Sequence, residues 1–378
     1  MKTTFKTILL SLMTAVFCVG SSINSSAQSA PNEGAVQVTA GKKPLDHSVY
    51  DKWYGMGGYL LTKDGKYSVI YQNRAENDGH IEIINLTDNS IKVVDRGAKA
   101  RLAQDNKHLL CMIRPFYKET KEAKLKKLKG DKMPKDTMCI VNLVTGNVQK
   151  FPFGKKMEVA KEGGNFVVFE SRIMNDSMKR DGVFVYDLAK EAVVDTLMNL
   201  EAYTFNKMGT ELYCLKKVVK EKAKKGTKGQ SDESAAGLSF DQRKDNSGIY
   251  IYRPASQEVE VVIEGTAKSK FVRPNLSKDE TILFFYANTD TTKKYEENVE
   301  IWTYKIGSNS PKKVIDNSIK GLRDGWNVSS FRAITMSDDN SKLFFGVGVP
   351  APKKDTTNKE EMAQLDVWHY NDKYIQTQ

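Results

Sequence analysis

The sequence predicts an all-β fold, a β-propeller, and three observations carry the prediction. A polar turn followed by an apolar strand recurs along the chain, and a further pair of β-rich runs follows each recurrence. Helical periodicity is almost absent after the first residues. Four strands repeated about six times are the sequence signature of a propeller, in which each four-stranded blade covers the faces of its neighbours.

The recurring phrase is clearest at residues 61–71, "LTKDGKYSVIY", where a polar turn precedes an alternating strand. Its variants are "LAQDNKHLLCMI" (102–113), "VAKEGGNFVVFES" (159–171), "FNKMGTELYCLK" (205–216), "LSKDETILFFYAN" (276–288) and "MSDDNSKLFFGVG" (336–348). We interpret each as the turn and inner strand of one blade. The aspartates Asp64, Asp105 and Asp279 are expected to cap their own turns through side-chain hydrogen bonds, without a catalytic role.

A second hairpin completes each repeat. These runs lie at 80–95, 138–153, 183–197, 248–263, 299–315 and 365–378. The first five show two β-rich segments around a turn, whereas the sixth shows only the beginning of its second segment. We therefore expect about six blades in a propeller domain over 46–378, with the last blade truncated.

The first residues read as a targeting segment. "MKTTFK" is basic, "TILLSLMTAVFCVG" is apolar but short for a membrane span, and the small residues before Gln28 fit a cleavage site. This order predicts a signal peptide over 1–27, followed by a flexible linker over 28–45. No later stretch is apolar enough to cross a bilayer. We expect a product exported to the periplasm or the extracellular space, without a membrane span.

The cysteines leave the disulfide state open. Removal of Cys18 with the signal peptide leaves Cys111, Cys139 and Cys214, an odd number. Buried free thiols are favoured for Cys111 and Cys214, which lie in predicted strands. One bridge can form, and the sequence does not choose its ends. Their spacing does not resemble a zinc site.

Lysine-rich insertions carry much of the positive charge. The chain has 58 Lys+Arg and 47 Asp+Glu, a net charge of +11. Insertions at 116–137, 216–247 and 350–363 each follow the inner strand of a blade, so we expect them on one face. The lysines lack interleaved aromatics and arginines, which disfavours nucleic-acid binding. A solvated, partly mobile loop is the favoured interpretation, and contact with a partner domain or an anionic surface is the alternative.

The sequence predicts no catalytic residue, cofactor site or metal site. The closest match to a G-x-S-x-G nucleophile elbow, "GLSFD" at 237–241, lacks the second glycine. The four histidines are separated in sequence from evident partners: His47, His80, His108 and His369. Glu296 and Glu297 form a candidate contact for a peptide amino terminus through charge-assisted hydrogen bonds. Solvated loop charge is the favoured interpretation of that pair.

Three stretches carry a family resemblance: 50–71, 96–137 and 343–378, above all "IRPFYKETKEAKLKKLKGDKMPKD" and "DVWHYNDKYIQTQ". The chain resembles the amino-terminal β-propeller of exported prolyl oligopeptidase or dipeptidyl peptidase-family serine peptidases. The resemblance implies a propeller of about seven or eight blades followed by an α/β-hydrolase domain with a Ser, Asp and His triad. This chain contains no such domain, so no triad residue is carried over. A truncated or split reading frame is one explanation.

The resemblance implies a non-catalytic propeller that gates peptide access to a hydrolase domain not present in this chain. Its partners would be peptides and either that hydrolase domain or another polypeptide that completes the propeller. The alternative is a free-standing periplasmic propeller that binds or scaffolds other proteins. An enzyme with a site in the central channel is least favoured, because the inner strands read as mostly apolar. Whether the whole protein is an enzyme is left open by these residues.

Overall fold

The structure is a computed structural model that describes residues 47–173, 181–216, 247–266, 269–290, 292, 295, 298–350 and 369–371. The chain divides into two compact units, 1–49 and 50–378. A short 3-10 helix, η1 (His47–Lys52), begins the described part. The predicted signal peptide (1–27) and linker (28–45) lie outside it. Among the described residues, no helix is long and apolar enough to span a membrane.

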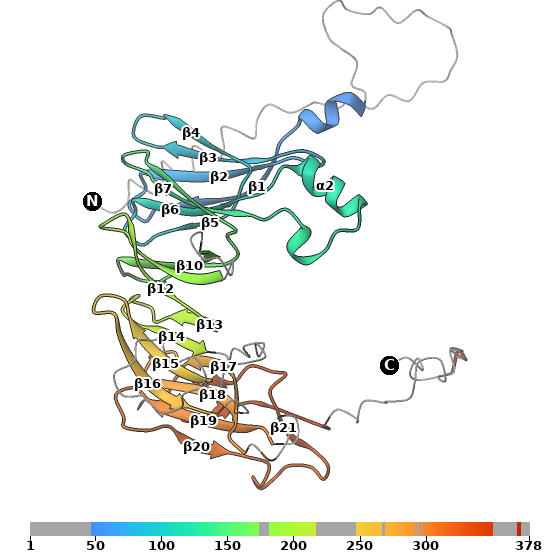
Figure 1. Ribbon diagram of the computed structural model, residues 1–378, viewed down its shortest axis with the longest axis vertical. Helices are drawn as coiled ribbons and strands as arrows, with labels where there is room; N and C mark the ends of the chain where they lie inside the picture. The colour runs from blue at the N-terminus through green and yellow to red at the C-terminus, as the bar shows by residue number, and fades with distance from the viewer. Residues whose placement is uncertain are drawn as a thin grey trace, which may run out of the picture. The chain divides into compact units, whose positions relative to one another are not determined.

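Within these ranges the second unit folds into five antiparallel four-stranded sheets that follow one another along the chain (Figure 1). Sheet 1 contains β1 (Gly55–Leu61), β2 (Tyr67–Asn73), β3 (His80–Asn85) and β4 (Ile91–Asp95). Sheet 2 contains β5 (Gly97–Leu102), β6 (His108–Ile113), β7 (Thr137–Asn142) and β8 (Val148–Pro152). Sheet 3 contains β9 (Met157–Val159), β10 (Phe166–Arg172), β11 (Asp181–Asp187) and β12 (Ala192–Leu197).

Sheet 4 contains β13 (Leu200–Phe205), β14 (Leu212–Lys216), β15 (Gly248–Arg253) and β16 (Glu258–Glu264). Sheet 5 contains β17 (Lys270–Leu276), β18 (Ile282–Asn288), β19 (Glu300–Lys305) and β20 (Lys312–Ile315). Two short pairs follow, β21 (Asn327–Ser329) with β24 (Gly346–Gly348) and β22 (Thr335–Met336) with β23 (Leu343–Phe344). The predicted all-β propeller architecture of four-stranded repeats is confirmed.

The recurring phrase forms the turn and the second strand of each sheet. β2, for example, pairs with β1 on one side and β3 on the other. The interpretation of this strand as the inner one is therefore wrong, because β1 precedes it at the sheet edge. The first strands do not show the period-two alternation of apolar and polar residues, because most of them contain a bulge. Examples are the bulges between Met56 and Gly58 in β1 and between Ala98 and Arg101 in β5. The sixth recurrence forms only the short pairs, and most of 365–378 lies outside the described residues.

The turn aspartates act as predicted. An Oδ1 atom accepts a backbone N–H two residues later at Asp64 (3.2 Å), Asp105 (2.9 Å) and Asp279 (3.1 Å). These hydrogen bonds replace water as partners of the turn N–H groups, and they fix the backbone where the turn leads into the second strand.

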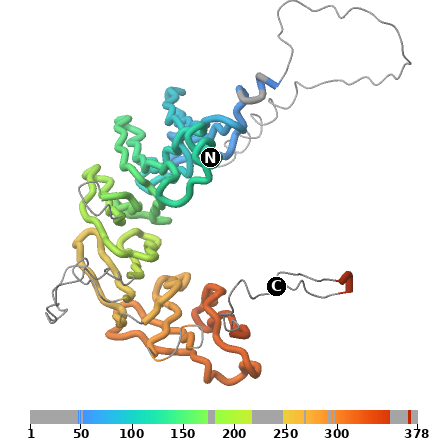
Figure 2. The backbone as a smooth tube through the Cα atoms, turned by 45° about the vertical axis from the view of Figure 1, so that its right-hand side comes forward, coloured from blue at the N-terminus to red at the C-terminus, as the bar shows by residue number. Residues whose placement is uncertain are grey.

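The core lies between neighbouring sheets, whose order along the chain Figure 2 traces from blue to orange. Leu109 on β6 packs in a cluster with Ile81 of sheet 1, whereas Leu110 packs with Phe169 of sheet 3. Alternate residues of a strand face opposite sides of its sheet. Because sheet 1 packs on one face of sheet 2 and sheet 3 on the other, all residues of β6 are buried. Similar clusters join sheets 3 and 4, sheets 4 and 5, and sheet 5 with the β21–β24 region. Face-to-face stacking of successive four-stranded sheets is the packing of propeller blades.

The first lysine-rich insertion contains a helix, α2 (Tyr117–Leu125), and a 3-10 turn, η2 (Gly130–Lys132). This helix was not predicted from the sequence, but most of its side chains are exposed, as expected of a solvated insertion. Contacts from sheet 1 explain the difference: Asp78 Oδ1 accepts the N–H of Tyr117 at 2.8 Å, and Lys121 Nζ lies 3.2 Å from Glu76 Oε2. Ala123 is buried on the inner side of the helix. The other two insertions lie almost wholly outside the described residues.

Candidate functional site

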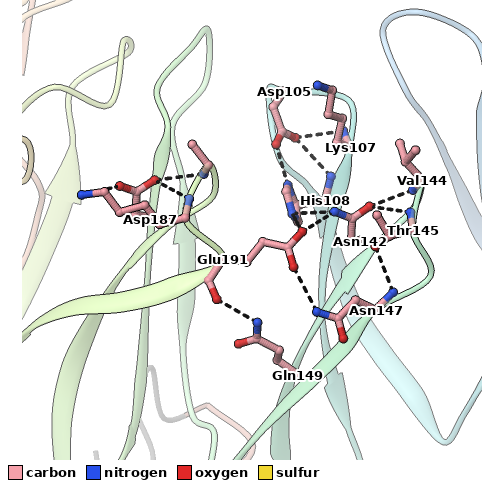
Figure 3. Close-up of polar contacts among 12 residues, drawn as sticks. Asp105, Lys107, His108, Asn142, Val144, Thr145, Asn147, Gln149, Asp187 and Glu191 are labelled. Carbon is pink, nitrogen blue, oxygen red and sulfur yellow. Dashed lines mark hydrogen bonds and ion pairs between the residues drawn. The ribbon is translucent and has the colours of Figure 1, made fainter.

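A buried polar cluster lies where the β5–β6 turn of sheet 2 meets sheet 3 (Figure 3). His108, the first residue of β6, is 4% exposed. Its Nδ1 lies 2.6 Å from Oδ2 of Asp105, whose Oδ1 accepts the N–H groups of Lys107 and His108. The turn that starts the second strand therefore also orients the imidazole, because its capping carboxylate lies three residues before the histidine.

The other side of the imidazole faces sheet 3. His108 Nε2 lies 3.5 Å from Oε1 of Glu191, which comes from the β11–β12 turn, and 3.4 Å from Asn142 Nδ2. The Glu191 carboxylate accepts hydrogen bonds from Asn142 Nδ2 and, at 3.0 Å, from Asn147 Nδ2. Its main-chain carbonyl accepts one from Gln149 Nε2 at 2.8 Å. One turn of sheet 3 is thus tied to three segments of sheet 2.

The charges in this cluster support one another. Burial disfavours the charged form of His108, but its hydrogen bond to Asp105 and the two carboxylate charges outweigh burial and raise its pKa. Burial acts against the charged form of Asp105 too, yet the hydrogen bonds from His108 and the Lys107 N–H lower its pKa. Hydrogen bonds from Asn147 and Asn142 lower the pKa of Glu191. The cluster therefore favours an imidazolium between two carboxylates.

The geometry of the cluster favours a structural clamp over a catalytic base. An Asp–His pair becomes a catalytic base when the second ring nitrogen faces a nucleophile. Here His108 Nε2 faces Glu191 and Asn142, which belong to the cluster itself. Sequence reasoning missed this cluster. The Asp-x-x-His spacing could have indicated its first half, whereas the Glu191 contact depends on the stacking of two sheets.

The other predicted candidates do not gather at one place. His80 Nε2 lies 3.1 Å from Glu82 Oε1 on the same strand, and its ring contacts Tyr54. Glu296, Glu297 and the "GLSFD" stretch lie outside the described residues, so their roles stay predictions. In the part of the chain that the structure describes, no three His, Cys, Asp or Glu side chains are grouped to hold a metal ion.

A cavity of about 220 Å³ lies where the first strands of sheets 3, 4 and 5 meet. Charged residues of β9 and of the following turns contribute to its wall: Glu158, Lys161, Lys207, Lys278 and Glu280. Both carboxylates bind backbone at the end of β13 and just after it, since Glu158 Oε1 accepts the N–H of Phe205 at 2.9 Å and Glu280 Oε1 accepts that of Lys207 at 2.7 Å. Of these five charged residues, only Glu158 lies on a first strand, and the other four lie in the turns that follow.

A second cavity, of about 420 Å³, lies at the other end of the sheets, where the second strand connects to the third. Its wall comes from the β2–β3 loop and the start of α2, including Glu76, Asp78, Tyr117 and Lys121. The adjacent Phe116 ring is covered by the Arg96 guanidinium at 3.8 Å. Aromatic faces and both charge signs meet there, as at polar protein–protein contacts.

The outer face of sheet 1 carries exposed apolar side chains. Leu60 and Val94 face sheet 2, so Tyr59, Leu61 and Val93 face the other side. Tyr59 is 71% exposed, Leu61 54% and Val93 50%. Ile91, 60% exposed, lies on the same face of β4 as Val93. Ile70 and Glu82 of the central strands lie between Tyr59 and Val93, so this face is mixed. Exposed apolar side chains gathered on one face are typical of interaction surfaces.

Comparisons with known proteins identify fold neighbours among solved structures. No family model and no curated protein matches the chain. Pyrococcus horikoshii acylaminoacyl peptidase is 14% identical, with a TM-score of 0.37, over 80% of this chain and 44% of that one. The β-propeller domain of the Pyrococcus furiosus trilobed protease is 11% identical, with a TM-score of 0.37, over 78% and 79%.

An oligogalacturonate lyase in complex with manganese is also similar, at 11% identity and a TM-score of 0.37, over 77% of this chain and 73% of that one. The chain thus spans less than half the length of the acylaminoacyl peptidase. At these identities the likeness concerns the fold, and the β-propeller assignment rests on the strand pairing and sheet stacking described above.

Proposed function

We propose that the chain is the non-catalytic propeller portion of an exported prolyl oligopeptidase-like serine peptidase. In this proposal it gates the access of peptides to a hydrolase domain. The sequence resemblance over 50–71, 96–137 and 343–378 supports the family, and the stacked four-stranded sheets agree with the propeller that this family would require.

The proposal that the chain needs a folded partner rests on the uncovered face of sheet 1. Strands β6 and β14 bury every residue because sheets pack on both of their faces. Tyr59, Leu61 and Val93 occupy the face of sheet 1 that corresponds to such an interface, yet each is at least half exposed. Burying a large apolar side chain contributes about 1.5–3 kcal/mol. A hydrolase domain, or a polypeptide that completes the propeller, would cover this face.

The cavity between the first strands supports the gating part of the proposal. β9, β13 and β17 are each the first, edge strand of their sheet. An edge strand offers backbone N–H and C=O groups to an extended peptide. Lys161 adds positive charge at the adjoining turn, which suits a carboxylate, whereas Lys278 is paired with Asp338 at 2.5 Å. In this proposal the cavity of about 220 Å³ takes up part of an unfolded peptide, whereas a folded protein is too large to enter it.

The test compares the isolated chain with the complex that it forms. We expect the purified chain to hydrolyse no proline-containing fluorogenic peptide and to resist labelling by a fluorophosphonate probe for serine hydrolases. Affinity purification from the native host should recover a labelled hydrolase in the same polypeptide or in a stable complex. Peptide cleavage by the isolated chain, at a rate that survives a protease-free control, would show that it is an enzyme by itself.

The alternative is a free-standing binding propeller. The cavity beside α2 favours it, because Asp78 and Glu76 hold the helix against sheet 1 and so present a formed surface. A stable monomer that captures a partner other than a hydrolase would support this alternative over the gating proposal.

A further inference from the structure

The structure resolves which cysteines stand opposite one another. Cys111 on β6 and Cys139 on β7 are direct Cα partners in the antiparallel register of sheet 2. Directly opposite residues in such a pair lie about 4.5–5.5 Å apart at Cα, and disulfides span Cα distances of about 4.4–6.8 Å. The backbone therefore already holds both residues within the range of a disulfide.

Both side chains point into one core. Cys111 and Cys139 are 0% exposed and belong to the apolar cluster between sheets 1 and 2, with Leu109 and Val141 as neighbours on the same strands. Both are free thiols here. Cys214 lies in a different core, between sheets 3 and 4, where its cross-strand partners are Tyr203 and Tyr250. Of the three cysteines in the described chain, only Cys111 and Cys139 are neighbours.

We propose that Cys111 and Cys139 are a cross-strand dithiol that a small disulfide oxidant converts into a disulfide. One cysteine attacks a sulfur of the oxidant and releases one thiol, and the second cysteine then displaces the other thiol from the mixed disulfide. The oxidant gains two electrons, and its two released thiols carry the two protons. Oxidation takes place during folding, when the strands are in register but the thiols are still accessible.

In the folded protein the surroundings make Cys139 the more acidic of the two thiols. The Cys111 thiol shares a hydrogen bond with Cys139, which lowers the pKa of Cys139 and raises that of Cys111. Burial opposes this effect at Cys139, and the charges of Lys150, its partner on β8, and of Lys92 assist it. The thiolate is the nucleophile in disulfide exchange.

The disulfide would close the base of the insertion that carries α2. Residues 114–136 lie between the two cysteine-bearing strands, including the wall of the cavity beside the helix. A disulfide would fix the register of β6 against β7 when the insertion moves or binds. This inference is independent of the proposed peptidase function, because it requires only the strand register and a disulfide oxidant.

The test is a disulfide map of the full chain, unfolded and then refolded with oxidised glutathione. Free thiols are alkylated, and the protein is digested with trypsin without reduction. The cysteines fall on three peptides, 108–118, 136–150 and 208–216, because trypsin does not cleave the Arg114–Pro115 bond. We expect the first two to appear as one linked species, about 2 Da lighter than their sum, and the third to be alkylated. Dithiothreitol should reduce the native protein at least about tenfold more slowly than the unfolded protein, because both sulfurs are buried.

Two variants provide the controls. Cys214→Ala removes the third thiol and should leave the linked species unchanged. Cys139→Ala should return peptide 108–118 in its alkylated form. Refolded protein with a cooperative thermal transition and all three peptides alkylated would overturn the proposal, as would a link between 208–216 and either of the other peptides.

Discussion

Removal of the Glu191 side chain should destabilise the stacking of sheet 3 on sheet 2. Glu191→Ala leaves Asn142 without its carboxylate acceptor and His108 without one of its two acidic neighbours. Asn142 is 8% exposed and His108 is 4% exposed, so neither is fully solvated in exchange. A buried polar group that loses its partner costs about 1–3 kcal/mol.

The lower half of that range applies to each group, because the Glu191 side chain is itself 29% exposed and water can enter the vacated space. We therefore expect Glu191→Ala to lower the free energy of unfolding by about 2–4 kcal/mol, or the Tm by about 3–6 °C for a domain of this size.

The assay is urea unfolding followed by tryptophan fluorescence, with Glu201→Ala as the matched control. Glu201 is exposed on β13, so its removal should change the free energy of unfolding by no more than about 0.5 kcal/mol. A loss at Glu191 no larger than the loss at Glu201 would refute the clamp. An altered m-value would show that the variant changed the unfolding transition itself.

Three further predictions follow from the same contacts. First, the pKa of His108 is raised, so its contribution to the free energy of unfolding is present at low pH and is lost as the pH rises through that pKa. The pKa values of Asp105 and Glu191 are lowered, so their contributions are present at high pH and are lost as the pH falls through those pKa values. The stability difference between wild type and His108→Gln should therefore peak at about pH 4.5–6.5 and shrink on both sides; a pH-independent difference would contradict the ion cluster. Second, Asp78→Ala removes the acceptor of the Tyr117 N–H and should cost α2 about 1 kcal/mol, measured as faster tryptic cleavage within 117–125; unchanged cleavage would show that the cap does not hold the helix. Third, the Cys111–Cys139 disulfide closes a loop of about 28 residues and should stabilise the oxidised protein by about 2–4 kcal/mol over the reduced one; equal urea midpoints would contradict a strain-free disulfide.

The repeat architecture could be predicted from the sequence because its signals are local. The turn at 62–66 and the alternation in β2 need only neighbouring residues, and each recurrence repeats them. The first strands were harder to recognise because bulges interrupt their period, as between Met56 and Gly58. The period-two pattern therefore marks the second strand of each sheet and not the first, inner one.

The helix α2 and the polar cluster depend on contacts distant in sequence. α2 arises in a lysine-rich segment, and its first turn is capped by Asp78 from another sheet. His108 meets Glu191 only because two sheets stack, although Asp105 is within a local turn. The choice of Cys111 and Cys139 as neighbours likewise required the register of β6 and β7. Local pattern indicates the elements, and stacking decides which side chains meet.

The most direct measurement of the central claim is the intact mass and composition of the native product recovered with an antibody against the propeller. The proposed function predicts a mass far above the 42.5 kDa of this chain, or a tight complex, with a hydrolase that contains a G-x-S-x-G nucleophile. A stable product near or below the mass of this chain, without a hydrolase, would contradict it and leave a propeller that binds other partners.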